Sequence, residues 1–102
     1  MIVDQSEVFE APATEWLHRE AKRLAATLSE FDVPRATARQ VCEAFIFRLA
    51  TGLDAEPVEA DNQPWQPTVA FLKQETLHLP DPSTFEWHDY ALGVVSEIFG
   101  DA

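Results

Sequence analysis

Hydrophobic residues recur at steps of three and four along much of the chain, which is the spacing of one face of an α-helix. The first such stripe consists of Leu17, Ala21, Leu24, Leu28 and Phe31. Pro12 suits the first turn of a helix, and the sequence Asp-Val-Pro ending at Pro34 stops one. The pattern predicts a helix over residues 12–31, preceded by an irregular N-terminal arm at residues 1–11.

A second helix is predicted over residues 34–52, with Asp32 as its N-terminal cap and Gly52 at its C-terminal end. Its inward face is made of small and apolar residues, namely Ala38, Val41, Cys42, Phe45, Ile46, Leu49 and Leu53. Phe47 projects on the opposite side, where a phenylalanine is costly unless another surface covers it.

Two further helices are predicted in the second half of the chain. Residues 68–79 fit both a helical and an alternating pattern, and we favour a helix because a proline precedes them and the sequence LPDP ends them. The last helix is predicted over residues 83–99, since Ser83 and Glu86 have the spacing of a capping box. Its surface is apolar nearly all round, with Phe85, Leu92 and Phe99 repeating at intervals of seven on the side opposite its main apolar face. We therefore expect it to be central in the domain or shared with a second chain.

These elements predict one all-α domain over residues 1–102, a small four-helix bundle with a long acidic loop between its second and third helices. A chain of 102 residues that is 46% hydrophobic can bury a core without metal or disulfide. The single cysteine, Cys42, excludes an intrachain disulfide and lies on an apolar stripe. The sequence shows neither a secretion signal nor an apolar run of ~20 residues, so we expect a soluble, cytoplasmic protein.

The net charge of −11 is unevenly distributed along the chain. Residues 1–51 carry a net −2, whereas residues 52–102 carry a net −9 with Lys73 as their one basic residue. Such a surface repels nucleic-acid phosphates and anionic membranes, and it attracts a basic protein. We therefore expect a protein partner with a basic surface, and neither nucleic acid nor membrane.

The acidic loop, DAEPVEADNQPWQP at residues 54–67, contains the first candidate for a partner site. Trp65 either folds back onto the bundle or forms an exposed anchor. Aromatic side chains ringed by charge are typical of binding hot spots. The candidate partner-binding residues are Trp65, Phe47, Phe85, Leu92 and Phe99, with Glu56, Glu59 and Asp61 as the surrounding acids.

Motifs for catalysis or cofactor binding are weak. Two Glu-x-x-His units, at Glu15 and His18 and at Glu75 and His78, are spaced as in di-iron bundles, but Glu15 lies on the far side of its helix from the apolar stripe. No nucleophile elbow or phosphate-binding loop is present, so we expect no enzyme and no cofactor. The alternative is a small metal-binding or enzymatic protein that uses His78, His88, Asp81, Glu86 and nearby carboxylates.

The sequence favours a module that acts by binding another protein. One form is an acidic inhibitor or immunity-type protein that blocks a basic enzyme, and the other is an assembly or accessory factor of a larger partner. The row of Phe85, Leu92 and Phe99 on the last helix predicts either a homodimer or a subunit of a hetero-complex. No motif in the chain carries a resemblance to a particular family.

Overall fold

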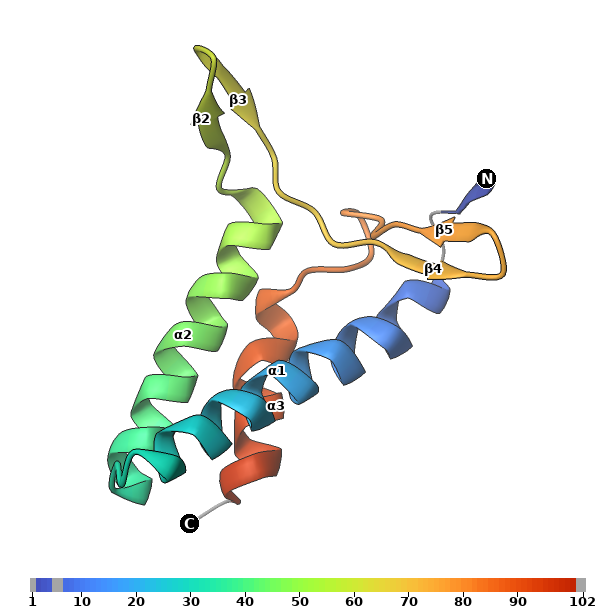
Figure 1. Cartoon of the computed structure of the whole chain (residues 1–102). Helices are drawn as coiled ribbons and strands as arrows, with labels where there is room; N and C mark the ends of the chain where they lie inside the picture. The colour runs from blue at the N-terminus through green and yellow to red at the C-terminus, as the bar shows by residue number, and fades with distance from the viewer. Residues whose placement is uncertain (1, 5–6, 101–102) are drawn as a thin grey trace.

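The computed structural model describes residues 2–4 and 7–100 of the chain. Its helices are α1 (Glu10–Glu30), α2 (Arg35–Ala55) and α3 (His88–Phe99), and a 3-10 turn at Glu7–Phe9 leads into α1 (Figure 1). Its strands are β1 (Ile2–Asp4), β2 (Val58–Ala60), β3 (Gln63–Trp65), β4 (Phe71–Lys73) and β5 (Thr76–His78).

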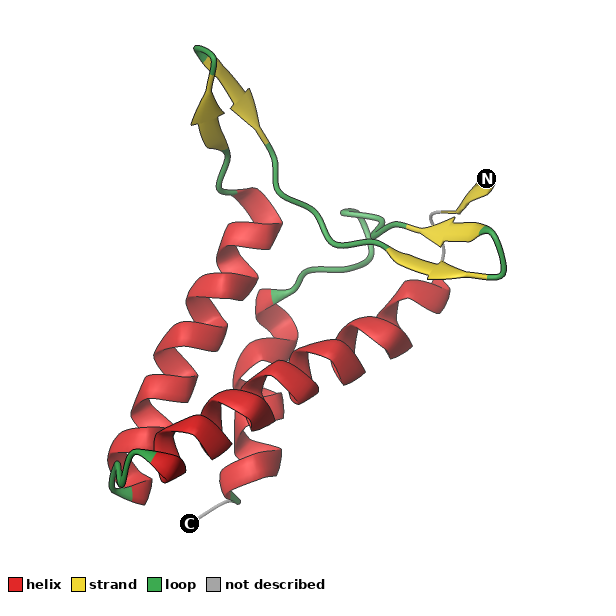
Figure 2. Ribbon diagram, viewed as in Figure 1, coloured by secondary structure: helices red, strands yellow, loops and turns green. Residues whose placement is uncertain are grey.

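The strands form two small, separate sheets (Figure 2). In the first sheet β5 lies in the middle, parallel to β1 and antiparallel to β4. In the second sheet β2 and β3 pair antiparallel as a hairpin that projects beyond the C-terminal end of α2. The fold is therefore three helices with two small sheets, and the prediction of an all-α four-helix bundle is wrong.

The predicted helix at residues 68–79 is a β-hairpin. Phe71 pairs with His78 and Lys73 pairs with Thr76, so the chain reverses at Gln74 and Glu75. Both turn residues have positive φ, 50° and 67°, as a type I′ turn requires at its two central positions. Strand β1 then pairs with β5, which gives part of the predicted N-terminal arm a regular structure.

The boundary between the first two helices is made by a C-terminal cap. Asp32 adopts a left-handed φ of 57°, and its backbone N–H donates to the carbonyl of Ser29 at 3.1 Å. The N–H of Val33 donates to the carbonyl of Leu28 at 3.0 Å, which completes a Schellman motif. Asp32 thus ends α1 rather than capping α2, whose first residue follows Pro34 without a side-chain cap.

The last helix begins at His88, five residues later than the capping-box spacing indicates. Ser83 uses its N–H and hydroxyl to donate to Asp81 Oδ1, at 3.0 and 2.7 Å, and so belongs to a turn. Phe85 consequently lies before the helix, in the segment that enters the core.

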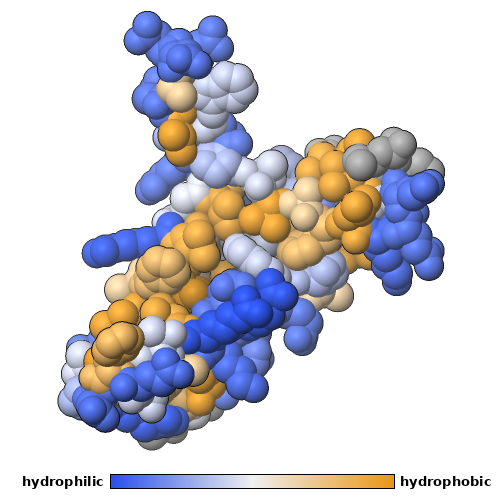
Figure 3. All heavy atoms as spheres, viewed as in Figure 1, coloured by the Kyte–Doolittle hydropathy of each residue, from blue (hydrophilic) through white to orange (hydrophobic). Residues whose placement is uncertain are grey.

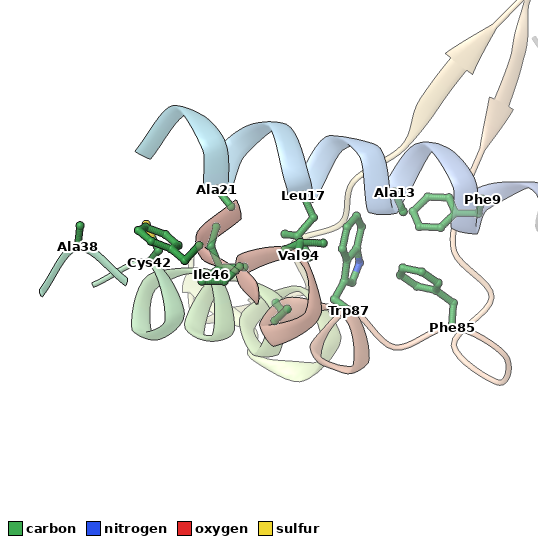
Figure 4. Close-up of a cluster of buried hydrophobic side chains, with 14 residues drawn as sticks. Phe9, Ala13, Leu17, Ala21, Ala38, Cys42, Ile46, Phe85, Trp87 and Val94 are labelled. Atoms are coloured by element: carbon green, nitrogen blue, oxygen red, sulfur yellow. The ribbon is translucent and has the colours of Figure 1, made fainter. Parts of the chain in front are cut away.

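The core lies where α3 packs against both α1 and α2 (Figure 4). Small residues such as Ala21 and Ala91 allow the helices to approach closely, and Leu17, Ile46 and Val95 fill the space between them. Aromatic rings close one end of this core. The ring centroid of Phe9 lies 5.0 Å from Phe85 and 5.6 Å from Trp87, both edge-on, an arrangement that aromatic pairs prefer.

Two arginines of α2 hold the other end of α3. Arg35 donates to the carbonyl oxygen of Phe99 at 2.8 Å, and Arg39 donates to that of Gly100 at 2.7 Å. Terminal helix carbonyls have no partner within their own helix and carry partial negative charge, so guanidinium groups stabilise them. The guanidinium of Arg35 also lies 5.1 Å from the centre of the Phe99 ring.

The molecule is more extended than a chain of its length needs to be. Its radius of gyration is 15.3 Å, against about 13 Å for a compact domain of this size. Its accessible surface is 7074 Å², roughly 1,300 Å² above the usual value for its mass. The β2–β3 hairpin, which stands away from the helices in Figure 1, accounts for part of this excess.

A membrane-spanning helix is not found within the described residues, because none of their helices combines the length and the apolar character that crossing requires.

A glycine substitution in the β4–β5 turn tests the hairpin, because it should change the free energy of unfolding in opposite directions for a hairpin and for a helix. Glu75→Gly removes the steric cost of a left-handed conformation at φ 67°, so we expect the free energy of unfolding to rise by about 1 kcal/mol. In a helix interior the same substitution would lower it by about 1 kcal/mol. Urea unfolding of both proteins measures the difference.

Thr76→Gly is the matched control, because Thr76 lies in β5 and lacks a positive φ. This variant should lose stability, as glycine does inside a strand. Destabilisation by Glu75→Gly would contradict the hairpin.

Candidate functional site

The β2–β3 hairpin is the most exposed element of the molecule, and we call residues 56–66 the arm. All six strand residues of the arm are exposed. Its turn residues Asp61 and Asn62 have φ of 52° and 61°, which again gives a type I′ turn. Unlike the residues of the β4–β5 turn, aspartate and asparagine tolerate this left-handed conformation. The arm thus owes its shape to local turn chemistry and cross-strand pairing rather than to burial.

The two faces of the arm differ in chemistry. Val58 and Trp65 are directly opposite each other in the ladder, and Ala60 lies two residues along the same face. Glu59, paired with Pro64, lies on the other face. In Figure 3 the tip of the arm is hydrophilic and hydrophobic atoms lie below it. The arm therefore presents a small apolar face bordered by acids.

Trp65 is the largest side chain of the arm and is 57% exposed. Its indole N–H donates to the carbonyl of Ala60 at 3.1 Å, so the ring is held across the hairpin while its faces remain accessible. The base of the arm is fixed by Gln66, whose amide donates to the carbonyls of Gly52 and Leu53, both at 3.2 Å. These bonds tie the end of β3 to the last turn of α2.

The predicted acids Glu56, Glu59 and Asp61 all lie on the arm and are exposed. No basic residue occurs between positions 54 and 67. Negative potential is therefore concentrated around Val58 and Trp65.

The other predicted anchor residues, Phe47, Phe85, Leu92 and Phe99, do not lie together on one surface. Leu92 is 52% exposed on α3, whereas Phe85 and Phe99 are core residues at 8% and 7%. Their spacing of seven does not place them on one helix face, because Phe85 precedes the helix. Phe47 is exposed on the side of α2 that faces away from the core.

A second group of polar residues joins the end of α2 to the start of α3. The carboxylate of Asp54 accepts the backbone N–H of Trp87 at 2.6 Å and that of His88 at 3.0 Å. These are two of the donors that a helix N-terminus leaves unpaired, so Asp54 acts as a cap supplied by another helix. The cap borders a cavity of about 360 Å³ that Pro80, Pro82 and Phe85 also line.

His88 is surrounded by carboxylates. Its Nδ1 lies 2.6 Å from Asp54 Oδ2, and its Nε2 lies 3.2 Å from Glu86 Oε2 and 3.4 Å from Asp89 Oδ1. The pKa of His88 is raised, first of all by the hydrogen bond to Asp54. Burial of the ring, the next largest cause, opposes this rise, and the negative charges of Asp54, Asp89 and Glu86 add to it. The protonated imidazolium form of His88 is thus favoured, and in this form both ring nitrogens donate to carboxylate oxygens.

The residues predicted for a metal site are only partly brought together. Among the described residues, Glu86, His88 and Asp89 offer ligand atoms within 4.8 Å of one another, and this group includes neither His78 nor Asp81. Asp81 is engaged by Ser83, whose hydroxyl and N–H lower the pKa of that carboxyl. An imidazole and two carboxylates would suit a divalent ion, but the raised pKa of His88 opposes the neutral imidazole that a metal requires.

Sequence reasoning missed Asp54 and Val58. A weak signal for Val58 is present, since Asp61 and Asn62, which lie between Val58 and Trp65, are residue types that tolerate the left-handed conformations of a type I′ turn. Nothing near Asp54 in sequence indicates that it caps a helix starting 34 residues later. Cys42 is buried, as its apolar stripe predicts, and burial raises the pKa of its thiol and keeps it unreactive.

Neither a model of a protein family, nor a curated protein, nor a solved structure matches the chain. Its function must therefore be inferred from its own geometry.

The carboxylates around His88 make a prediction about pH. NMR titration should give His88 a pKa above the ordinary value for histidine, and Asp54→Asn should lower it, because the first cause of the shift is the hydrogen bond to Asp54. A raised folded-state pKa stabilises the fold fully below the unfolded value of about 6.5, and this contribution disappears as pH rises through the folded value. Urea unfolding across this window should show the decline.

His88→Gln is the control, because it removes the titrating group and should flatten the dependence in that window. A His88 pKa at or below the ordinary value would contradict the contact with Asp54.

Proposed function

We propose that the protein acts by binding another protein that has a basic surface, and that the arm makes the first contact. The observation that carries this proposal is the exposure of Trp65 on a projecting hairpin that buries none of its own strand residues.

Energetics support this assignment. An isolated two-stranded hairpin is only marginally stable in water, because it has no second layer to bury its apolar face. Val58 and Trp65 lack such a layer here. A partner that covers them gains apolar burial at a site whose backbone is already shaped, which lowers the entropy cost of association.

The charges around the arm favour a basic partner. Its acids belong to the half of the chain that carries a net −9, so the field extends beyond the arm itself. Complementary charge raises the rate of encounter and excludes acidic competitors, while a central aromatic residue contributes most of the affinity. The arm combines these two elements in one segment.

Two forms of this function fit the same surface. An inhibitor or immunity-type protein would use the acidic arm to occupy a basic catalytic site, and an assembly or accessory factor would use it to hold a subunit. They differ in a measurable way, since an inhibitor abolishes the partner's activity on binding and an accessory factor preserves or raises it.

Trp65 gives the sharpest test of the arm. We expect Trp65→Ala to reduce capture of the partner at least tenfold, because hot-spot truncations cost about 2 kcal/mol or more. The measurement is quantitative mass spectrometry after in-cell cross-linking in the native host, using wild-type and variant baits. The partner is then purified and titrated against both.

Leu72→Ala is the matched control, because Leu72 is an exposed apolar residue on the other hairpin. A partner captured by wild type and Leu72→Ala but lost by Trp65→Ala supports the arm. Equal retention by all three baits would overturn it.

Salt dependence tests the role of charge. The dissociation constant should rise at least tenfold between 0.1 and 1 M salt, as the Debye length shrinks from about 10 to about 3 Å. Replacing two arm acids, Glu56→Gln with Glu59→Gln, should make this dependence shallower. Glu15→Gln on α1 should leave it unchanged, and an affinity independent of salt would remove charge as the basis of partner choice.

A further inference from the structure

The arm has two open edges, because within the described residues β2 and β3 pair only with each other. The edge of a sheet presents backbone N–H and C=O groups with which a further strand can pair. In an antiparallel ladder, residue pairs that exchange hydrogen bonds alternate with pairs whose backbone groups point outward. The register of the arm therefore decides which groups each edge offers.

The two edges of the arm are not equivalent. Ala60 and Gln63 flank the two-residue turn, so they form a pair of the hydrogen-bonded kind. Glu59 and Pro64 form the next pair, and their backbone groups therefore point outward. Proline has no N–H, so the β3 edge offers only a carbonyl at this position, whereas the β2 edge offers both the N–H and the carbonyl of Glu59. A third strand can thus pair fully on β2 but not on β3.

The β2 edge is accessible to another chain. All three residues of β2 are exposed, and the arm stands away from the helices in Figure 1. An extended segment therefore has room beside β2.

The two faces of the arm determine which strand fits this edge. The side chains of an added strand alternate between the two faces, as those of β2 do. One face carries Val58 and Trp65, and the other carries Glu59. The matching strand has apolar residues on the first face, where they cover Val58 and Trp65. On the second face it has basic residues, one of which gains from opposite charge beside Glu59.

Charge excludes the arm of a second copy from this edge. Two β2 strands side by side would bring Glu56, Glu59 and Asp61 of both copies together, and like charges across a pair of strands are destabilising. No basic residue between positions 54 and 67 compensates for these acids. The strand that fits therefore belongs to a different, basic protein.

We propose that a partner protein adds an extended segment of alternating basic and apolar residues to the β2 edge, and that this segment pairs with the backbone of Glu59. The inference rests on the proposed function, because it specifies how the arm binds its basic partner. Backbone pairing supplies affinity in this mode of binding, and the alternating side chains supply specificity. The third strand also converts a marginal two-stranded hairpin into a three-stranded sheet, which is more stable.

Synthetic peptides test the β2 edge by NMR without the partner. The probe is the blocked peptide Lys-Val-Lys-Val-Lys-Val-Lys. The matched control is Lys-Lys-Val-Val-Val-Lys-Lys, which has the same composition and charge without the alternation. The probe should shift the amide resonance of Glu59. At a probe concentration ten times the dissociation constant, hydrogen exchange of this amide should slow about tenfold. The control peptide should produce neither change.

Variants of Glu59 separate its N–H from its charge. Glu59→Pro removes both, and Pro64 directly opposite shows that this position of the ladder accepts proline. Glu59→Gln removes only the charge, so its affinity for the probe should fall about threefold. Glu59→Pro should bind the probe at least tenfold more weakly than Glu59→Gln, because the strand loses a backbone donor. The indole N–H resonance of Trp65, which donates to Ala60, reports whether each variant keeps the hairpin.

Three results would overturn the proposal: equal binding of the two peptides, unchanged exchange of the Glu59 amide with the probe bound, or equal affinity of Glu59→Pro and Glu59→Gln. The exchange measurement uses wild type and does not depend on the folding of a variant. A wild-type mass above 11.5 kDa that Glu59→Pro returns to the single-chain value would overturn the proposal in favour of a second copy.

The peptide and the captured partner distinguish this inference from the proposed function. Loss of the partner by Trp65→Ala, with no response of Glu59 to the probe, would overturn strand addition and leave the proposed function in place. Binding of the probe at Glu59, with the partner retained by Trp65→Ala, would leave strand addition in place and overturn Trp65 as the anchor.

Discussion

The burial of α3 is the constraint on which the rest of the structure depends. This helix has only 12 residues, yet it is apolar over most of its circumference and must be covered on several sides. Both ends of it are bound by α2, through Asp54 at the N-terminus and through Arg35 and Arg39 at the C-terminus. The inward face of α2 is therefore fully committed, and its last turn becomes the fixed base from which the arm projects.

Much of the helical framework could be read from the sequence, because helix periodicity is a local property. Both predicted stripes reach the core, through Leu17 and Ala21 of α1 and through Ala38, Cys42 and Ile46 of α2. The prediction is wrong for Phe31, Val41 and Phe45, which are 77%, 38% and 53% exposed, because α3 covers a narrower strip of each helix than the spacing indicates. The last helix is central, which is one of its two expected positions. The helix ends were less accurate, since backbone conformation decides them. Aspartate is a residue type suited to a helix N-terminal cap, but Asp32 adopts the left-handed conformation of the cap that ends α1. The N-terminus of α3 is capped by Asp54, which lies on another helix.

The sheets were missed for two different reasons. Neither Gln74 nor Glu75 is a glycine, asparagine or aspartate, the residue types that favour the left-handed conformations found at these positions. The β4–β5 turn therefore has no sequence signature. The pairing of β1 with β5 joins segments far apart in the chain, and no local pattern encodes it. The candidate site was more accessible to prediction. The exposed indole of Trp65 and its acidic surroundings follow from composition, whereas the two faces of the arm needed the register of its strands.

The arm is the element whose presence the fold itself does not explain. Ordering the backbone costs about 1–2 kcal/mol for each residue, and folded segments usually offset that cost by burying apolar surface. The strands of the arm bury none of their side chains, and the arm is tied to the last turn of α2 by the backbone N–H of Glu56 and the amide of Gln66. The core, the Asp54 cap and the arginine contacts are all formed by residues outside the arm. A segment that buries so little of its own surface, yet presents a tryptophan among acids, supports the proposal that the arm is a surface for contact with a partner.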